Sequence, residues 1–152
     1  MGEGVVLKAP SVISVEALGS CVALALYDIN RRIGGIAHIM LPNSDNGNIP
    51  CTPYQCADTA MTTLLEELRN AGAHIQDIVA KMVGGSCMFA FDNSIGKRIG
   101  EDNIMSIMHL LKREGIPLTG KDIGGNYGRS VEFHLNSGRL IVRGFGIKER
   151  EI

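Results

Sequence analysis

Two apolar runs in the N-terminal third constrain the fold more than any other feature of the sequence. Residues Cys21–Tyr27 read CVALALY and residues Ile33–Leu41 read IGGIAHIML, without alternation between apolar and polar positions. Strands of this kind are typically buried on both faces. The five residues between the runs, Asp28–Arg32, are mostly polar and suit the turn of a hairpin. The sequence therefore predicts a hairpin whose two strands are both buried.

The rest of the chain is expected to supply two helices and further strands. Apolar residues at helical spacing and capping residues predict helices over Gln55–Gly72 and from a cap at Asp102 or Asn103 to Gly115. The remaining strands are expected at Val5–Leu7, Ser11–Val15, Asp77–Met82, Ser130–Leu135 and Arg139–Arg143. The order ββββ-α-β-α-ββ predicts a single α/β domain, residues 1–152, with a mixed sheet and both helices packed on one side.

Charge and hydropathy argue against several classes of function. Fifteen Lys and Arg residues against sixteen Asp and Glu leave a formal charge of −1, with no basic stripe of the kind that binds nucleic acid. The apolar runs are far shorter than the roughly 18–20 residues that cross a bilayer. Residues Met1–Pro10 lack the apolar segment of a signal peptide. We therefore expect a cytoplasmic protein that neither binds nucleic acid nor inserts into a membrane.

The four cysteines, Cys21, Cys51, Cys56 and Cys87, are expected to be free thiols, because disulfides are rare in cytosolic proteins. A zinc site on Cys51 and Cys56 would need two further ligands from elsewhere in the chain. A metal-binding or redox protein that uses these two cysteines and a histidine is the weakest of the alternatives. We expect neither a metal nor a cofactor.

The predicted hairpin brings a nucleophile and a base together. A catalytic cysteine attacks as the thiolate and needs a partner to lose its proton at neutral pH. If the chain reverses around Ile29 and Asn30, Cys21 stands directly opposite His38, with Cβ atoms about 4.5–5.5 Å apart. A turn shifted by half a residue or one residue makes them near or diagonal neighbours instead. In each case the cysteine and the histidine meet at the end of the hairpin away from its turn.

Gly19 and Ser20 precede this cysteine and are small, so the backbone there can bend and direct N–H groups at a developing oxyanion. The structural alternative is that Cys21 is a small core residue and His38 an ordinary hydrogen-bonded histidine. Cys87 competes for the catalytic role because two small residues precede it in the same way. No histidine lies near it in the sequence, and a packed thiol is the expected role.

Ordered motifs through most of the chain resemble those of the CheD family of chemoreceptor glutamine deamidases. They are Leu18–Val22 with Ala37–Pro42, Tyr54 with Ala57–Ala60, Lys81 with Gly84, Gly85, Met88 and Phe89, Ile99 and Gly100 with Asn103, Gly124–Asn126 with Arg129–Glu132, and Gly138 with Val142 and Arg143. The resemblance implies a layered α/β/β fold, similar to that of the cytotoxic-necrotizing-factor toxin deamidases, with a Cys–His pair.

The resemblance also implies an activity and partners. The activity is that of a cysteine-dependent protein-glutamine glutaminase, which hydrolyses selected glutamine side chains of methyl-accepting chemoreceptors to glutamate and ammonia. Cys21 would form the thioester, and His38 would activate the thiol, protonate the departing ammonia and activate the hydrolytic water. A CheC-type phosphatase is the implied second partner, and it competes with the receptor.

One position departs from the family pattern. The third catalytic position, six residues before the cysteine, is threonine in the family and Val15 here. A valine side chain cannot orient an imidazole, and Ser14 could replace it only if the strand bulges. The main-chain carbonyl of Val15 remains a candidate for this role. Val15 also favours an alternative function, a catalytically weak adaptor that binds receptors or CheC, and extra residues within Ala90–Arg98 are expected to reshape a binding surface.

Overall fold

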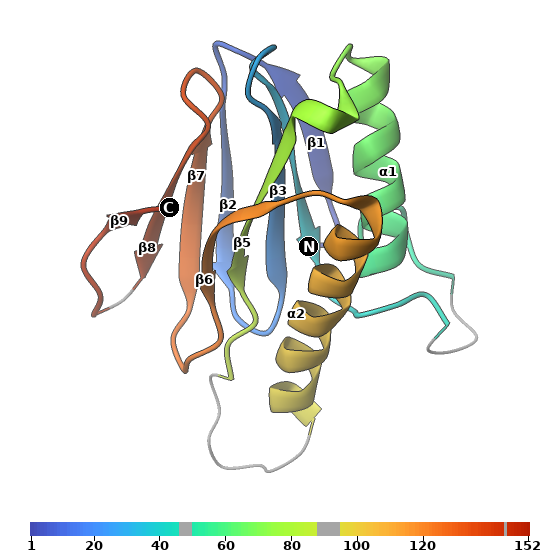
Figure 1. Ribbon diagram of the computed structural model, residues 1–152. Coiled ribbons are helices and arrows are strands. Elements are labelled where there is room, and N and C mark those ends of the chain that lie inside the picture. Colours follow the sequence, from blue (N-terminus) through green and yellow to red (C-terminus); the bar gives the residue numbers. More distant parts are fainter. Residues whose placement is uncertain (46–49, 88–94, 145) are drawn as a thin grey trace.

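The computed structural model describes residues 1–45, 50–87, 95–144 and 146–152, with the side chains of residues 95–98 excepted. Two β-sheets stack face to face, and two helices cover the outer face of the larger sheet (Figure 1). The strand order is β1-β4-β3-β5-β6 in the five-stranded sheet and β2-β7-β8-β9 in the four-stranded sheet.

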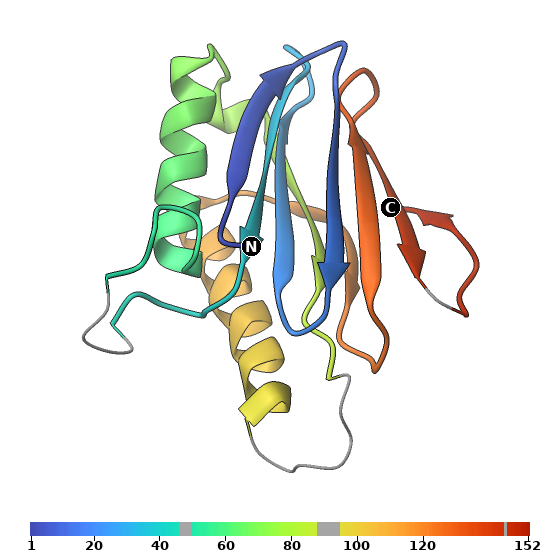
Figure 2. The ribbon, with the colours of Figure 1, turned by 180° about the vertical axis from the view of Figure 1, so that it is seen from behind.

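The elements follow one another in this order: β1 (Gly4–Lys8), β2 (Val12–Leu18), β3 (Val22–Asp28), β4 (Ile33–Ile39), α1 (Ala57–Asn70), the 3-10 helix η1 (Ile75–Asp77), β5 (Ile78–Gly84), α2 (Ile95–Glu114), β6 (Leu118–Ile123), β7 (Arg129–His134), β8 (Arg139–Gly144) and β9 (Arg150–Glu151). The chain passes from the four-stranded sheet to the five-stranded sheet between β2 and β3, through one short loop (Figure 2).

The predicted hairpin of β3 and β4 is confirmed as the centre of the larger sheet. Every residue of both strands is buried, as the absence of polar alternation predicts. Strand β3 pairs with β4 on one side and with β5 on the other, antiparallel in both cases. Because helices cover one face and the second sheet covers the other, both faces of the hairpin need apolar side chains.

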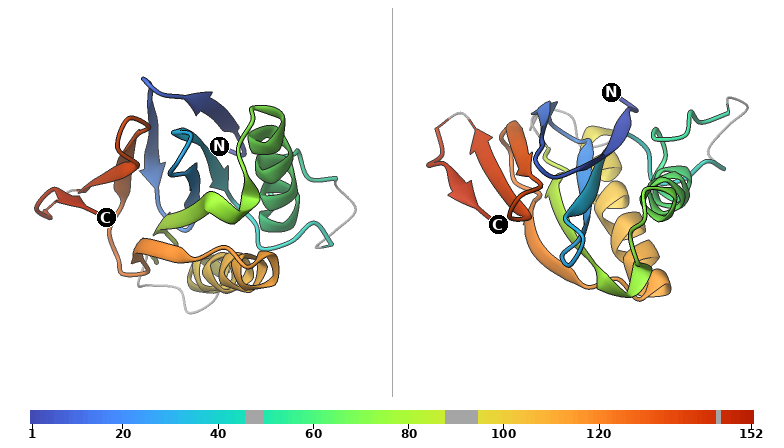
Figure 3. Two further views of the ribbon diagram at one scale, coloured as in Figure 1. Left: turned by 45° about the horizontal axis from the view of Figure 1, so that its top comes forward. Right: turned by 90° about the horizontal axis from the view of Figure 1, so that it is seen from above.

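The two faces of the larger sheet belong to two separate cores. The helix-side core contains Leu24, Met61, Leu64, Leu68, Met82 and Ile107. The core between the sheets contains Ile13, Ala23, Ile36, Phe133, Leu140 and Val142. Successive strand residues point to opposite faces, so even-numbered β3 residues face the helices and odd-numbered ones face the second sheet. The expected α/β/β layering and the packing of both helices on one side are confirmed (Figure 3).

Helix α2 begins earlier than the sequence predicted. It starts at Ile95, so the expected cap at Asp102 or Asn103 is wrong. Asn103 is buried within the helix, and its side-chain amide donates to the carbonyls of Ser20 and Met40. The side-chain N–H groups of Asn103 bond to backbone carbonyls outside α2 instead of capping the helix. The local sequence alone does not reveal these long-range contacts.

Two strands were not predicted. Strand β6 has the sequence LTGKDI, in which a glycine and two charged residues mask the strand pattern. It forms by parallel pairing with β5 after the crossover through α2, a contact between residues far apart in the chain. Strand β9 is only two residues long. In the described parts of the chain, no helix combines the length and apolar character needed to cross a membrane.

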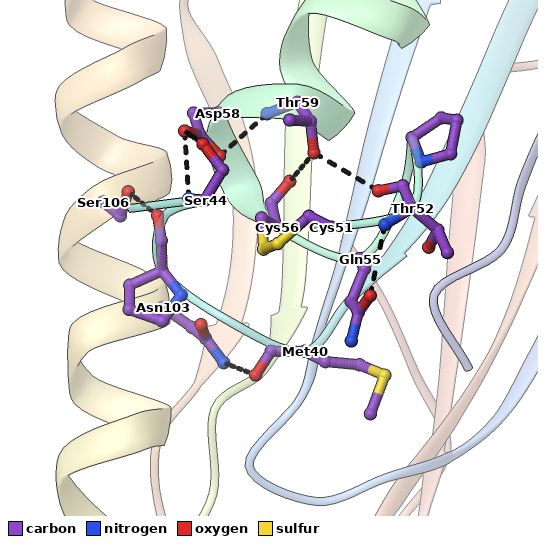
Figure 4. Close-up of a disulfide and its surroundings, with 12 residues drawn as sticks. Met40, Ser44, Cys51, Thr52, Gln55, Cys56, Asp58, Thr59, Asn103 and Ser106 are labelled. Carbon is purple, nitrogen blue, oxygen red and sulfur yellow. Dashed lines mark hydrogen bonds between the residues drawn. A yellow bond between two sulfur atoms is a disulfide. The ribbon is translucent and has the colours of Figure 1, made fainter. Parts of the chain in front are cut away.

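The expectation of four free thiols is wrong for one pair. Cys51 and Cys56 form a disulfide at the entry to α1 (Figure 4). A tight turn closes between them, in which the N–H of Gln55 donates to the carbonyl of Thr52 and the N–H of Thr52 donates to the side chain of Gln55. The turn brings the two Cα atoms to 6.0 Å, within the range that a disulfide spans. The sulfur atoms that the metal alternative required are therefore bonded to each other.

Candidate active site

Cys21 lies in the loop Gly19–Cys21 between β2 and β3. Each carbonyl group of this loop accepts a hydrogen bond from another part of the chain. The carbonyl of Gly19 accepts from the backbone N–H of Ser86 at 2.8 Å, and that of Cys21 accepts from the backbone N–H of Gly85 at 2.8 Å. The carbonyl of Ser20 accepts from the side-chain amide of Asn103 at 3.1 Å. The segment that follows β5 and the helix α2 therefore fix every residue of the loop.

Two glycines at the end of β5 allow this close approach. Gly84 has a φ of +119°, and a Cβ atom there would lie 2.2 Å from the carbonyl oxygen of Cys21. Gly85 has a φ of +69°, and a Cβ atom would lie 2.4 Å from the side chain of Ile104 on α2. The absence of side chains at these two glycines therefore permits the close backbone approach.

Ser86 is itself fixed from a third direction. Its hydroxyl donates to the carbonyl of Tyr127 at 2.7 Å and accepts a hydrogen bond from the guanidinium of Arg129. Arg129 is buried and forms an ion pair with Asp122 at 3.0 Å. This buried pair connects the segment that holds the Cys21 loop to β6 and β7. The sequence pattern does not predict this ion pair, although Arg129 belongs to one of the motifs.

His38 lies on the same face of the larger sheet as Cys21. Residues of β4 at even positions, such as Ile36, contribute to the core between the sheets, and Cys21 packs against the same core. The β3–β4 ladder places Ala23 opposite His38, so Cys21 is the diagonal neighbour of the histidine. Of the expected arrangements, the structure has the one produced by a turn shifted by one residue. Diagonal neighbours are about 7–8 Å apart, within reach of long side chains.

His38 and Val15 line one pocket between the two sheets. The pocket has a volume of about 590 Å³ and is bordered by β1, β2 and β4. His38 is 7% exposed, and its Nε2 atom has no hydrogen-bond partner among the described residues. An imidazole nitrogen without a protein partner can exchange a proton with a substrate group that is brought against it.

Ser14 lines the same pocket as Val15 and His38. It is exposed on β2 and pairs with Glu132 of β7. The irregularity in this pairing lies between Val15 and Leu18, where Ala17 has a φ of 59°. The bulge that Ser14 would need therefore comes later in the strand.

Burial controls the protonation of both candidate residues. Burial raises the pKa of the Cys21 thiol, and the nearby amino terminus and the residue's own N–H only partly offset this effect. Burial also lowers the pKa of His38, as does the amino terminus, while Glu3 opposes the shift. At neutral pH the arrangement is a thiol beside a neutral imidazole, which is the form that acts as a general base.

The alternative nucleophile, Cys87, lies beyond Ser86, and its N–H donates to the carbonyl of Gly125 at 2.8 Å. His134 is part of β7, and its Nε2 atom lies 3.5 Å from a carboxylate oxygen of Glu132. The packing expected of Cys87 against its neighbours Met88 and Phe89 lies outside the described residues. Residues 90–94 of the segment in which extra residues were expected also lie outside the described residues, and residues 95–98 form the start of α2.

Comparisons with known proteins identify the family to which the chain belongs. The family model described as CheD chemotactic sensory transduction matches residues 40–144. The chain is 43% identical over 146 residues to the chemoreceptor glutamine deamidase CheD of Thermotoga maritima, with 96% of this chain and 90% of that protein covered. It is 39% identical over 151 residues to the "probable chemoreceptor glutamine deamidase CheD" of Caldanaerobacter subterraneus subsp. tengcongensis, with 97% and 93% covered.

A third relative, from Clostridium acetobutylicum and also named "probable chemoreceptor glutamine deamidase CheD", is 38% identical over 144 residues, with 94% of this chain and 87% of that protein covered. The family model begins after Cys21 and His38, but the pairwise similarity extends over nearly the whole chain. The chain therefore belongs to the CheD family.

Proposed function

We propose that this protein is a chemoreceptor glutamine deamidase, a cysteine-dependent protein-glutamine glutaminase. Family membership supports the class of reaction, since relatives that cover nearly the whole chain carry this name. The observation that carries the proposal for this chain is the placement of Cys21 and His38 on one sheet face, as diagonal neighbours. The replacement of the family threonine by Val15 leaves both Cys21 and His38 in the chain.

The proposed reaction has two halves that share a thioester. His38 takes the proton of the Cys21 thiol as the sulfur attacks the side-chain carbonyl carbon of the substrate glutamine. The tetrahedral intermediate collapses with cleavage of its C–N bond, and the imidazolium returns the proton to the departing ammonia. His38 then removes a proton from water, which attacks the thioester and releases the glutamate side chain and the Cys21 thiol. The net reaction consumes one glutamine side chain and one water.

The roles of Val15 and of the loop follow from the same geometry. The Val15 carbonyl is proposed to accept a hydrogen bond from the imidazole and so to hold the ring with its other nitrogen toward the thiol. Support comes from the pocket that Val15 and His38 share. Backbone N–H groups of the Gly19–Cys21 loop are proposed to stabilise the oxyanion, because its fixed carbonyls also fix the direction of its N–H groups.

The partners are proposed at two levels. The substrate is the glutamine side chain of a chemoreceptor, as named for the relatives. Binding of a CheC-type phosphatase and location in the cytoplasm are finer proposals, which rest on the resemblance and on composition.

The alternative function, an adaptor with weak catalysis, is favoured only by Val15. Mass spectrometry of a chemoreceptor cytoplasmic fragment separates the two functions, because conversion of glutamine to glutamate adds about one mass unit per site. We expect the wild type and a Cys87→Ala variant to convert glutamine and Cys21→Ala to be inactive. A wild type that binds the fragment but converts no glutamine would establish the adaptor instead.

A further inference from the structure

One side chain of α2 connects the loop of the proposed nucleophile to the strand of the proposed base. Asn103 is fully buried, and its Nδ2 atom donates to the carbonyl of Ser20 at 3.1 Å and to the carbonyl of Met40 at 3.0 Å. Figure 4 shows the carboxamide directed at Met40, just beyond the end of β4. Because both donor directions are occupied, the plane of the carboxamide is fixed between the two carbonyls.

The Ser20 carbonyl belongs to the same peptide unit as the N–H of Cys21. In a trans peptide the C=O and N–H groups point in opposite directions. The carbonyl points toward Asn103 in the helix layer, so the N–H of Cys21 points away from that layer. The Cys21 side chain packs on this opposite side, against the core between the sheets. The N–H and the thiol therefore lie on the same side of the loop, as an oxyanion donor requires.

We propose that Asn103 is a positioning residue, which orients the Ser20–Cys21 peptide so that the N–H of Cys21 donates to the oxyanion formed during deamidation. The neighbouring carbonyls, those of Gly19 and Cys21, are held by backbone N–H groups of Ser86 and Gly85. Among the hydrogen bonds of the described residues, the carbonyl that a side chain holds in this loop is that of Ser20, in the peptide that carries the N–H of Cys21.

Asn103 is an energetically unfavourable residue for a buried position in a helix, which indicates that its two N–H donors are needed there. Asparagine is a weaker helix former than alanine or leucine. The Oδ1 atom of Asn103 is buried and has no hydrogen-bond partner in the described parts of the chain. An unsatisfied buried acceptor is unfavourable, so an apolar residue would suit this helix better if packing were the only requirement. What an apolar residue cannot supply is the pair of N–H donors.

Because this inference rests on the proposed function, its test compares two reactions of the same thiol. Deamidation passes through an oxyanion, whereas alkylation of Cys21 by iodoacetamide depends on the thiolate and forms no oxyanion. The variants are Asn103→Ala and Asn103→Asp, the second of which keeps the shape and removes donors. The matched control is Ser106→Ala, since Ser106 lies one turn later in α2 and also bonds a backbone carbonyl, that of Pro42. Thermal unfolding of each variant is measured alongside.

In folded Asn103 variants we expect kcat for deamidation to fall about 10-fold to 100-fold with little change in KM. This is less than the roughly 10²–10³ that removal of an oxyanion donor costs, because the N–H of Cys21 is kept and loses only its fixed direction. The rate of Cys21 alkylation should stay within about threefold of wild type, and Ser106→Ala should keep both rates. Unchanged deamidation in folded Asn103 variants overturns the inference. Equal loss of deamidation and alkylation also overturns it, because the residue would then act on the thiol as a whole.

Two further outcomes are decisive. If both Asn103 variants fail to fold, the carboxamide holds the fold in general and the local positioning role is contradicted. A wild type that converts no glutamine overturns the proposed function and this inference with it. An active wild type with equally active Asn103 variants overturns this inference alone.

Discussion

Cys21 is the diagonal neighbour of His38 across the β3–β4 ladder, on the face directed at the second sheet. The relationship follows from a turn of four residues, Ile29–Arg32, because Asp28 pairs with Ile33. At a separation of about 7–8 Å, proton transfer requires both side chains to extend toward each other. The Nε2 atom of His38 has no hydrogen-bond partner in the part of the chain that the structure describes, and His38 lines the pocket; both facts are consistent with a base that engages fully once substrate is bound.

The pH dependence of deamidation should report the neutral imidazole of His38. Burial lowers the pKa of His38, so the base form persists at pH values below the ordinary histidine value of about 6.5. Activity should therefore be lost as the pH falls through this lowered pKa, because protonation removes the base. The measurement is kcat/KM for a receptor fragment between about pH 5 and 9. An acidic limb centred above the ordinary value would contradict a buried, neutral base.

The side chain of Val15 should matter little if its carbonyl orients the imidazole. We expect Val15→Thr and Val15→Ala to change kcat by no more than about threefold, because both substitutions keep the carbonyl. Steady-state deamidation assays at saturating receptor fragment give the comparison. A gain of more than about tenfold in Val15→Thr would show that the family hydroxyl is the missing orienting group.

Gly84→Ala should disrupt the Cys21 loop. A Cβ atom at Gly84 would lie 2.2 Å from the carbonyl oxygen of Cys21, which is backbone and cannot rotate away. We expect the free energy of unfolding in urea to fall by about 1–3 kcal/mol and deamidation to decrease. Gly115→Ala is the matched control, since Gly115 also has a positive φ, +69°, but no atom within 4 Å of the added Cβ. Equal effects of the two substitutions would show that backbone strain alone, and not contact with the loop, is responsible.

The turn of the central hairpin should make the fold sensitive to acid. Asp28 is fully buried and accepts hydrogen bonds from the backbone N–H groups of Asn30, Arg31 and His74. Burial alone would raise the pKa of Asp28, but these donors and the Arg31 guanidinium hold it below its ordinary value. The stabilisation is present above the unfolded pKa of about 3.9 and is lost as the pH falls through the lower, folded pKa.

Replacement of this carboxylate gives a direct measurement of its contribution. Asp28→Ala should lower the free energy of unfolding at neutral pH by about 2–3 kcal/mol, since it leaves several buried donors without an acceptor. The difference from wild type should shrink in urea titrations at a pH low enough to protonate Asp28. A difference that is constant with pH would show that packing, and not the charge, accounts for the loss.

The sequence predicts the centre of this fold better than its connections. Apolar runs identify β3 and β4, and helical spacing identifies α1, because burial on two faces or on one leaves a pattern in neighbouring residues. The register depends on the turn, where Arg32 adopts a φ of 54° and its N–H bonds the carbonyl of Asp28. Positive φ at arginine has no sequence signal, so the sequence could not select the shift by one residue from the alternative registers.

In the candidate site, too, local features could be predicted and long-range contacts could not. Cys21 and His38 were found because they belong to the buried hairpin, whose geometry brings them to one end. The support from Asn103 and Ser86 was missed, because it consists of hydrogen bonds between elements that are distant in the chain. The disulfide of Cys51 and Cys56 was missed because the general rule about cytosolic thiols says nothing of a particular turn.

The most direct test of the central claim is to trap the thioester on Cys21. The protein is mixed with a chemoreceptor fragment, quenched in acid, digested and analysed by mass spectrometry for a receptor peptide bonded to a cysteine with loss of ammonia. We predict that the peptide is attached to Cys21 in the wild type, that Cys21→Ala forms no adduct, and that His38→Ala forms it much more slowly. Attachment at Cys87, or deamidation that persists in Cys21→Ala, would contradict the assignment of Cys21 as the nucleophile.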